Sequence, residues 1–470
     1  MSAAIRMLNH FPVFDAGLIR RYDGHGPRYT SYPTAAQFTE EFDADAYVRA
    51  ARQTNEPPIP DRLSAYIHIP FCDTVCFYCG CNKVVTKNRK RAATYLEYLF
   101  KEIEWQGALY DRDREVVQLH LGGGTPTFLN PVEMTSLMSE LSARFTLSDA
   151  PDRDYSIELD PRSVDPEGVR HLADLGFNRF SIGVQDIDEK VQRAVNRIQP
   201  FALTRRIVDA CRDAGANSVN IDLIYGLPHQ SEKGFVRTLS RIIDDAQPDR
   251  LSIFNYAHLP ERFKSQRQID AGALPSPEEK LRILAASIDT LAEAGYMHIG
   301  MDHFALPHDS LAQALHAGTL QRNFQGYSTH AGCDLVSMGV SAIGKPGDSY
   351  CQNAKSLDDY YARIDAGQLP VVRGFTLNDD DCIRAAAIQQ LSCHYALDSK
   401  LLSDRFGIAF DDYFAVEVDQ LRILARDGLV SLKRGQWCVS AKGRLLIRNI
   451  CAVFDRYQQA TASTGFSRLI

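Results

Sequence analysis

Seven short apolar stretches recur between Ser64 and about Ala305, and stretches with helical spacing separate them. The strand candidates are residues 64–69, 116–121, 155–159, 180–184, 219–224, 251–255 and 297–301. Several are rich in valine, isoleucine and leucine, which is typical of strands buried on both faces. Repeated βα units predict a parallel sheet, and six or seven units favour a partial or complete α/β barrel. Periodicity alone does not distinguish such a barrel from an open sheet.

The pattern predicts three regions along the chain. Residues 1–55 lack the alternation and hold several glycines and prolines, so we expect an irregular extension. Residues 56–360 carry the barrel pattern. Residues 361–470 read as a mainly helical domain with a short hairpin before the last helix, similar to a winged-helix module.

Composition and charge limit the functions that the chain can have. Its 470 residues are 45% hydrophobic and 24% charged, which is ordinary for a globular protein. The formal net charge of −7 gives no general attraction for nucleic acid or anionic lipid. No apolar run approaches the ~18 residues of a membrane span, and the first residues show no signal pattern. We therefore expect a cytoplasmic protein without a membrane or nucleic-acid partner.

The number of cysteines indicates metal binding or catalysis rather than disulfides. The chain has 11 cysteines, an odd number that does not suggest a disulfide framework in a large cytoplasmic protein. Four of the 11 fall between positions 72 and 81. We expect the other seven to be small buried side chains.

The spacing of Cys72, Cys76 and Cys79 is C-x3-C-x2-C, directly after the first predicted strand. Three thiolates in one loop can ligate three corners of a [4Fe–4S] cluster and leave the fourth iron open. S-adenosyl-L-methionine can chelate that iron and accept one electron from the cluster. Two alternatives are a structural zinc site, which usually needs two separated cysteine pairs, and a four-thiolate electron-transfer cluster. The second would use Cys81, which only Gly80 separates from Cys79.

Polar and glycine-rich positions follow the later strands. Gly122, Gly123 and Gly124 come directly after the second predicted strand and would let the backbone approach a ligand closely. Glu158, Gln185 and Asp222 each lie near the end of a strand, with Arg197 beyond Gln185. Carboxylates suit ribose hydroxyls, and a guanidinium suits the methionine carboxylate. Any one of these residues taken alone could be an ordinary surface polar residue.

With these motifs the chain is identified as a member of the radical S-adenosylmethionine superfamily. It closely resembles the oxygen-independent coproporphyrinogen III oxidases of haem biosynthesis, through nearly its whole length. The resemblance includes the stretches 26–34, 79–83, 183–186, 220–228, 255–260, 323–327 and 442–450. Several long motifs in the family's order are more specific than any one of them.

The resemblance implies the site residues. Cys72, Cys76 and Cys79 would be the cluster ligands, Tyr66 would lie by the cofactor, and Tyr78 would pack on the adenine. The family binds two S-adenosylmethionine molecules. Positions that match its contacts are Gly123, Gly124, Thr125, Glu158, Gln185, Arg197, Asp222, Ala257 and Ile343, with Phe324 and Gln325 near the second cofactor.

The resemblance also implies the reaction. A 5′-deoxyadenosyl radical would take a hydrogen atom from a propionate of coproporphyrinogen III, and loss of carbon dioxide and one electron would leave a vinyl group. Two such steps would give protoporphyrinogen IX. We expect a monomer that needs a low-potential electron donor and an electron acceptor, for which the sequence has no motif. Arg20, Arg21, Arg28 and Arg322 are candidates for holding the anionic substrate, although each could equally be a solvated surface charge. The N-terminal extension, residues 1–55, is a candidate for a lid.

Three other functions compete with the oxidase. Haem chaperones share the barrel and the cysteine motif, but they lack the stretches at 79–83 and 323–327. A regulator that binds nucleic acid would use the basic residues near the C-terminus, which we expect to be a solvated face. The sequence also leaves open a divergent paralogue with altered activity.

Overall fold

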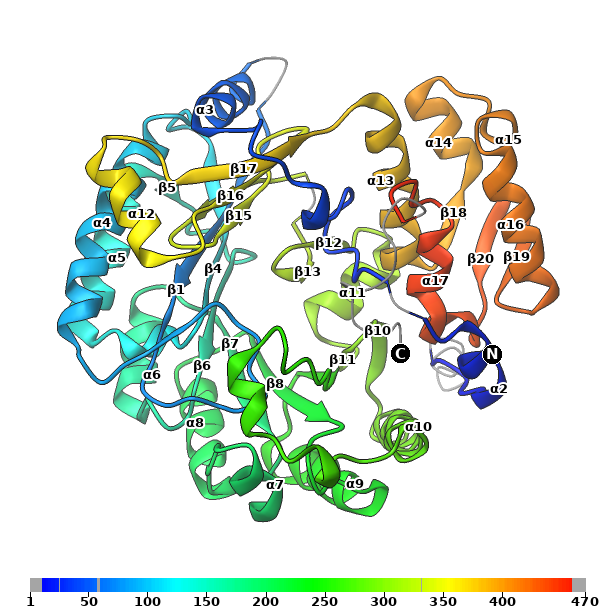
Figure 1. Ribbon diagram of the computed structural model, residues 1–470, viewed down its shortest axis with the longest axis horizontal. Coiled ribbons are helices and arrows are strands. Elements are labelled where there is room, and N and C mark those ends of the chain that lie inside the picture. The colour runs from blue at the N-terminus through cyan, green and yellow to red at the C-terminus, as the bar shows by residue number, and fades with distance from the viewer. Residues whose placement is uncertain (1–10, 25, 57–59, 331, 459–470) are drawn as a thin grey trace.

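A computed structural model describes residues 11–24, 26–56, 60–330 and 332–458. Its main element is a ten-stranded sheet with the order β10-β11-β9-β8-β7-β6-β4-β1-β14, with β5 paired to β4 (Figure 1). The strands from β14 to β9 in that order are all parallel to their neighbours. The sheet strands are β1 (Leu63–Ile69), β4 (Glu115–Gly123), β5 (Thr146–Leu147), β6 (Asp154–Leu159), β7 (Arg179–Gln185), β8 (Ser218–Tyr225), β9 (Arg250–Asn255), β10 (Met297–Gly300), β11 (His303–Ala305) and β14 (Asp334–Met338).

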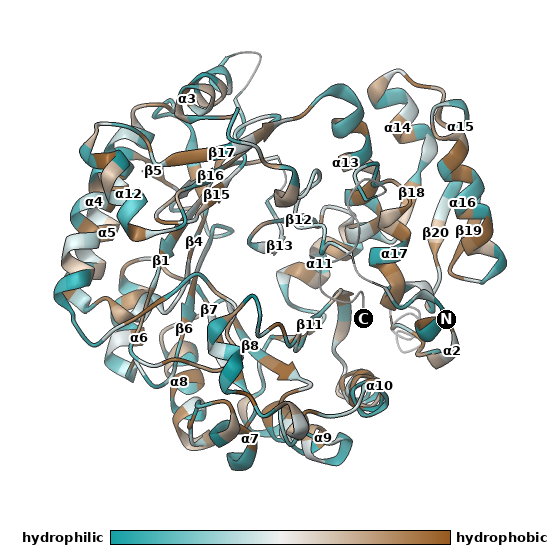
Figure 2. Ribbon diagram, in the orientation of Figure 1, coloured by the Kyte–Doolittle hydropathy of each residue, from teal (hydrophilic) through white to brown (hydrophobic). Residues whose placement is uncertain are grey.

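Helices cover the outer face of this sheet (Figure 1). They are α4 (Lys90–Gly107), α5 (Pro131–Arg144), α6 (Pro166–Asp174), α7 (Glu189–Ala194), α8 (Phe201–Asp213), α9 (Glu232–Arg241) and α10 (Pro277–Glu293). Hydrophilic residues recur on outer helices such as α7 and α9 (Figure 2). One large core joins the helices to the sheet, with Ile221 of β8 and Phe235 of α9 among its fully buried members.

All seven predicted strands are present, but the sheet differs from a simple parallel series at both edges. After β10 the chain turns at Met301, whose φ is +49°, and returns as β11. β11 pairs antiparallel with both β10 and β9, so β10 does not lie beside β9. At the other edge β14, a strand that the pattern did not predict, pairs parallel with β1. Among the described strands β10 and β14 are not paired, which makes the sheet a partial barrel.

The strands are not apolar on both faces as predicted. Ile221 and Leu223 point to the helices, whereas Asn220 and Asp222 point the other way, into the barrel. In register with them, Ser181 of β7 pairs with Asn220, and Ser252 of β9 pairs with Asp222. The inner face therefore carries polar side chains at every second position of neighbouring strands.

The described part of the N-terminal extension contains two α-helices and a short 3-10 helix (Ala35–Gln37) besides irregular chain. In α2 (Ala16–Tyr22) and α3 (Ala44–Gln53), Asp15 and Asp43 accept hydrogen bonds from the first backbone N–H groups. Tyr47 of α3 packs in the main core, whereas α2 lies beside the C-terminal region (Figure 1). The extension thus contacts both.

Short helices and small antiparallel sheets follow β11. They comprise α11 (Ser310–Ala317), β12 (Gln321–Asn323), β13 (Gly326–Ser328), β15 (Ile343–Gly344), β16 (Ser349–Asn353), α12 (Leu357–Asp365) and β17 (Val371–Thr376). β12 and β13 form one hairpin, and β15, β16 and β17 form a three-stranded antiparallel sheet.

The C-terminal region has its own buried cluster, which includes Leu391, Leu421 and Phe454 and takes in Tyr29 and Tyr32 from the extension. Its elements are α13 (Asp379–His394), β18 (Ala396–Asp398), α14 (Ser399–Phe406), α15 (Phe410–Tyr413), α16 (Ala415–Arg426), β19 (Val430–Lys433), β20 (Gln436–Val439) and α17 (Ile447–Ala452). The predicted hairpin is β19–β20. In the described parts of the chain, no helix combines the length and apolar composition needed to cross a bilayer.

Candidate active site

The three cysteines of the C-x3-C-x2-C motif lie in one loop after β1. Cys72 ends the two-residue strand β2 (Phe71–Cys72), which pairs with β3 (Val84–Val85). Cys76 is buried, and Cys72 and Cys79 are partly buried. The loop thus stands at the C-terminal edge of the parallel strands, where enzymes with α/β barrels place their reactive groups.

Distant segments fix the backbone of this cysteine loop. The loop's main-chain groups bond to residues after α7 and to the segment 264–268. These bonds are Phe77 N to Val195 O at 3.0 Å, Asn196 Nδ2 to Val75 O at 2.8 Å, Gln266 Nε2 to Tyr78 O at 2.9 Å and Ser265 Oγ to Cys79 O at 2.9 Å. These hydrogen bonds therefore tie the cysteine loop to two segments that lie far from it in the sequence.

Each of the three sulfur atoms is approached by a donor. The donors are Thr125 Oγ1 at 3.4 Å from Cys72 Sγ, Cys81 N at 3.4 Å from Cys79 Sγ, and Arg162 Nη2 and Arg197 Nη1, both 3.6 Å from Cys76 Sγ. Hydrogen bonds to cysteine sulfurs tune the potential of an iron–sulfur cluster and stabilise thiolates.

This donor set fits a three-thiolate cluster. A hydrogen bond with the Cys81 thiol lowers the pKa of Cys79 to about 6 despite its burial, whereas burial raises the pKa of Cys72 to about 11. Among the described residues, no three Cys, His, Asp or Glu side chains converge closely enough to bind a single metal ion. A cubane cluster needs no such convergence, because each thiolate binds a different iron.

The glycine run at residues 122–124, which was predicted to approach a ligand, packs against the cysteine loop. Gly124 N donates to Ile69 O at 2.8 Å, and a Cβ on Gly124 would lie 2.7 Å from Pro70 C and O. Gly123 has a φ of +116°, and its Cβ would lie 2.6 Å from the His68 ring. Gly124 is needed because the end of β4 lies in contact with the backbone of Pro70 and Phe71, and Gly123 is needed because of its positive φ and the His68 ring beside it.

Replacing Gly124 by alanine should disturb the cluster without touching a cysteine. The new Cβ would push the loop backbone away from β4, and misplacement of reactive groups by ~1 Å costs roughly 100-fold in rate. We expect cluster-dependent turnover to fall by about that factor, with lower iron content after reconstitution. The matched control is Gly234→Ala in α9, where the nearest atom to the new Cβ is Ser231 Oγ at 3.3 Å. Normal iron content in Gly124→Ala would contradict this role.

A network of inward-facing side chains lies beside the loop. His120 Nδ1 bonds with Ser156 Oγ at 2.7 Å, and His120 Nε2 lies 3.5 Å from Glu158 Oε1. Glu158 Oε2 accepts a bond from Gly123 N at 3.2 Å. Tyr66 stacks on His120 with ring centroids 5.8 Å apart. The Glu158 carboxylate is thus oriented from two sides at the end of β6.

Tyr66 also links to a second histidine. Its hydroxyl bonds with His68 Nδ1 at 3.0 Å, and His68 Nε2 bonds with Asn82 O at 3.0 Å. Burial lowers the pKa of His68, so a neutral ring is favoured. The neutral ring can then bridge the tyrosine to the chain just after Cys81.

Asp222 and Arg197 are also held by neighbours. Asp222 accepts bonds from Ser181 Oγ at 3.0 Å and Asn220 Nδ2 at 2.8 Å, and burial raises its pKa. Arg197 Nη1 lies 3.0 Å from Asp160 Oδ2, and its Nη2 bonds with Gly183 O at 2.5 Å. The Arg197 guanidinium therefore ties the cysteine loop to the ends of β6 and β7. Its predicted contact with a methionine carboxylate stays a prediction.

Buried amide oxygens without a partner mark space for a ligand. Among the described residues five buried amide oxygens have no partner; three of them belong to Gln185, Asn255 and Gln325, which the sequence analysis or the strand ends place at the candidate site, and the other two belong to Gln199 and Asn449. Gln185 has a φ of +71° at a register shift between β7 and β8, a conformation that is sparsely populated for this residue. S-adenosylmethionine carries amino and hydroxyl donors, so unpaired acceptors suit it.

The remaining predicted residues lie on either side of this network. Tyr78 packs in a small buried cluster with Val191 and Tyr256, and Ala257 follows β9. Phe324 lies at the β12–β13 turn against Tyr350, with ring centroids 5.9 Å apart, and Gln325 Nε2 lies 3.4 Å from Ala65 O. Ile343 begins β15.

The sequence analysis missed His68, His120, Asp160 and Arg162. The signal for the histidines was present, because each lies two positions from another inward-facing residue of its strand. Asp160 and Arg162 follow β6 closely, but nothing in the sequence indicates that Arg162 reaches Cys76 or that Asp160 pairs with Arg162 and Arg197.

Comparison with known proteins gives the family. Residues 66–242 match the Radical SAM superfamily, and residues 377–446 match the HemN C-terminal domain. The oxygen-independent coproporphyrinogen III oxidase of Pseudomonas aeruginosa is 52% identical over 460 residues, covering 97% of this chain and 99% of that protein. This chain belongs to the oxygen-independent coproporphyrinogen III oxidase family.

Other members agree with this placement. The Escherichia coli K12 oxidase is 47% identical over 458 residues, which cover 97% of this chain and 98% of that protein. The solved structure of Escherichia coli coproporphyrinogen III oxidase, described as a radical SAM enzyme, matches with a TM-score of 0.89 and 46% identity over 95% of this chain and 99% of that one. Members of this radical SAM family use a [4Fe–4S] cluster and S-adenosylmethionine. The predicted fold class and family are confirmed.

Proposed function

We propose that the protein converts two propionates of coproporphyrinogen III into vinyl groups by oxidative decarboxylation, without oxygen, and so forms protoporphyrinogen IX in haem biosynthesis. Each reacting propionate loses a β-hydrogen atom, carbon dioxide and one electron. The observation that carries the proposal is whole-length similarity to oxidases of that name. The cysteine loop at the C-terminal edge of the sheet supports it.

The chain's own residues would provide the setting for this reaction. A bound [4Fe–4S] cluster with S-adenosylmethionine supplies one-electron chemistry for hydrogen abstraction. Cys72, Cys76 and Cys79 would hold the cluster. The residues that would contact S-adenosylmethionine are Tyr66, Tyr78, Gly123, Gly124, Thr125, Glu158, Gln185, Arg197, Asp222, Ala257 and Ile343. Phe324 and Gln325 would lie near the second molecule.

The oriented Glu158 carboxylate would make polar contacts with S-adenosylmethionine. The stacked Tyr66 and His120 rings would hold that carboxylate in place and exclude water. Such pre-orientation matters because a reactive radical needs a closed site. We further infer a cytoplasmic monomer that works with a low-potential electron donor and a separate electron acceptor.

The decisive experiment is anaerobic turnover of the reconstituted protein with coproporphyrinogen III, S-adenosylmethionine and a reductant. We expect protoporphyrin, after oxidation of the product, and 5′-deoxyadenosine to accumulate together. Omission of S-adenosylmethionine should stop both. A protein that forms its cluster and retains haem but makes no protoporphyrin would instead be a haem chaperone.

A further inference from the structure

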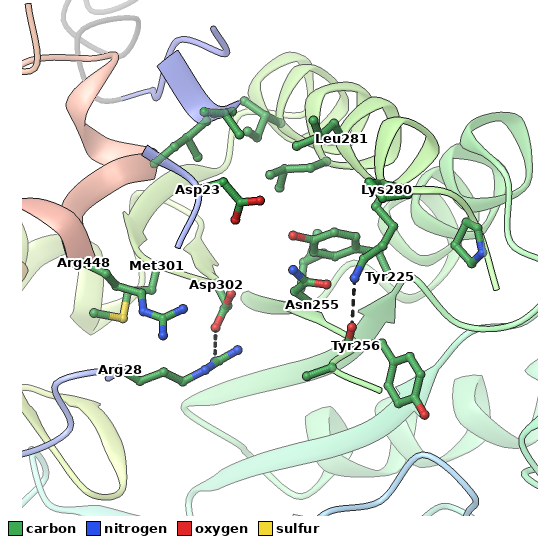
Figure 3. A pocket seen from close by; sticks show the side chains of 18 of the residues that line it. Asp23, Arg28, Tyr225, Asn255, Tyr256, Lys280, Leu281, Met301, Asp302 and Arg448 are labelled. Carbon is green, nitrogen blue, oxygen red and sulfur yellow. Dashed lines mark hydrogen bonds and ion pairs between the residues drawn. The ribbon is translucent and has the colours of Figure 1, made fainter. Parts of the chain in front are cut away.

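A cavity of about 550 Å³ lies where the N-terminal extension, the barrel and the C-terminal region meet (Figure 3). Its walls come from α2, α10, α17, the ends of β8 and β9, and the turn between β10 and β11. Ala257, one of the predicted cofactor contacts, lines it. The cavity therefore adjoins the candidate active site along the segment that follows β9.

One wall of the cavity is apolar, and this wall is mainly from α10 and the sheet. Its side chains include Ile253, Leu281, Leu284, Ile288 and Phe304. Ligand sites of this size usually combine such a wall with a few placed polar groups. Here Asn255 also lines the cavity, and its buried Oδ1 has no partner.

Basic side chains outnumber acidic ones in the lining of the cavity: the basic ones are Arg20, Arg28, Lys280, Arg444 and Arg448, and the acidic ones are Asp23, Glu278 and Asp302. Arg28 Nη1 lies 2.5 Å from Asp302 Oδ2, and both side chains line the cavity (Figure 3). Burial opposes ionisation of Asp302, but the charges of Arg28, Arg448 and Arg322 hold the pKa of that carboxyl below its ordinary value. Burial and the charges of Arg28 and Arg322 lower the pKa of Arg448 to about 10. The charges of three guanidinium groups thus act on Asp302, although of these three only Arg28 and Arg448 line the cavity.

Arg28 is held there by the other two arginines. Arg448 Nε donates to Pro27 O at 3.0 Å, Arg448 Nη2 donates to Gly26 O, and Arg322 Nη1 donates to Arg28 O. These bonds fix the backbone of residues 26–28, so the Arg28 side chain projects from a fixed base. Of the four arginines predicted for substrate, Arg20 and Arg28 line the cavity. Arg21 instead pairs with Asp427 on the surface, with its side chain 61% exposed.

We propose that this cavity binds a propionate-bearing edge of the tetrapyrrole substrate, with Arg28 as the carboxylate contact and Asp302 as an internal competitor for that arginine. The proposal rests on the proposed function, because that function makes the ligand an apolar macrocycle with four carboxylates. The apolar wall suits the macrocycle, and the excess guanidinium charge suits the carboxylates. Substrate binding would also secure the N-terminal extension, which carries Arg28, against the barrel.

The test is binding of coproporphyrin III, the stable oxidised form of the substrate, to the reconstituted enzyme by fluorescence titration. Loss of a charge-assisted hydrogen bond in Arg28→Gln should raise Kd about 10- to 100-fold. The KM for coproporphyrinogen III should rise similarly, while iron content stays normal. Arg21→Gln, on the same side of the molecule but outside the cavity, should bind coproporphyrin III as the unsubstituted protein does.

A second variant is not expected to weaken binding. Asp302→Asn removes the competing carboxylate, so its Kd should be equal to or lower than that of the unsubstituted protein. A rise in Kd for Asp302→Asn would mean that the Arg28–Asp302 pair is only structural and would overturn the proposal, even if Arg28→Gln fails to fold. Unchanged Kd and KM in a folded Arg28→Gln would overturn it as well.

Failure of the two proposals can be told apart. If the unsubstituted enzyme makes protoporphyrin but Arg28→Gln has the same Kd and KM, the oxidase function stands and the cavity proposal falls. If no protoporphyrin forms but coproporphyrin III binding still depends on Arg28, the cavity binds tetrapyrrole carboxylates and the oxidase function falls.

Discussion

Replacing Cys76 by serine will abolish formation of both protoporphyrin and 5′-deoxyadenosine. Cys76 is the most buried of the three motif cysteines, at 8% exposure, and the guanidinium groups of Arg162 and Arg197 both point at its sulfur. A serine hydroxyl is a poor iron ligand, and it leaves those two cations facing a neutral group. Iron content, visible absorption and anaerobic turnover measure the loss. Turnover above a few per cent of the unsubstituted protein would contradict the ligand assignment.

Cys81→Ser is the matched control, and it separates the two cluster alternatives. Cys81 is exposed and only two residues from Cys79. The backbone N–H of residue 81, which donates to Cys79 Sγ, remains in the variant. If three thiolates hold the cluster, Cys81→Ser will assemble it with the same iron content as the unsubstituted protein. If four thiolates hold it, the variant will lose iron as Cys76→Ser does.

Local sequence patterns predicted which residues form strands, but they did not predict which strands lie side by side at the edges of the sheet. Each predicted strand is a short apolar run, and burial against the outer helices is enough to mark it. The edges could not be read this way. The β10–β11 reversal depends on a positive φ at Met301, and β14 joins β1 from 271 residues further along the chain. Such pairings depend on the whole fold rather than on a local pattern.

At the candidate site, too, local motifs were predicted and contacts between distant segments were not. The cysteine spacing and the glycine run are local, and both point to the correct loops. The sequence predicted a close backbone approach at Gly124 but not what approaches it. The nearest atoms belong to the backbone of Pro70, which follows β1. Contacts such as Arg162 to Cys76, which span 86 residues, depend on how β1 and β6 meet the loop. Sequence reasoning therefore found ligand candidates but not the groups that orient them.

Replacing Glu102 by alanine will strongly destabilise the protein although the residue lies outside the candidate site. Glu102 of α4 is fully buried, and its oxygens accept bonds from Asn353 Nδ2 at 2.7 Å, Gly339 N at 2.8 Å and Tyr360 Oη at 2.5 Å. Alanine leaves three buried donors unpaired and opens a cavity, at a cost of about 3–5 kcal/mol. Urea denaturation of the apoprotein measures this. A loss below about 1 kcal/mol would mean that water replaces the carboxylate.

Glu102→Gln is the matched variant, and it adds a test of pH dependence. Burial, against the opposing effect of its hydrogen bonds, raises the pKa of Glu102 from an ordinary value near 4.5 to about 7. The folded protein therefore binds this proton more tightly than the unfolded chain does, and the resulting stabilisation is fully present below pH 4.5. It is lost as the pH rises to about 7, by roughly 3 kcal/mol relative to Glu102→Gln, whose amide does not titrate. A stability difference between the two proteins that stays constant across this window would show that the Glu102 carboxyl is already ionised at its low end.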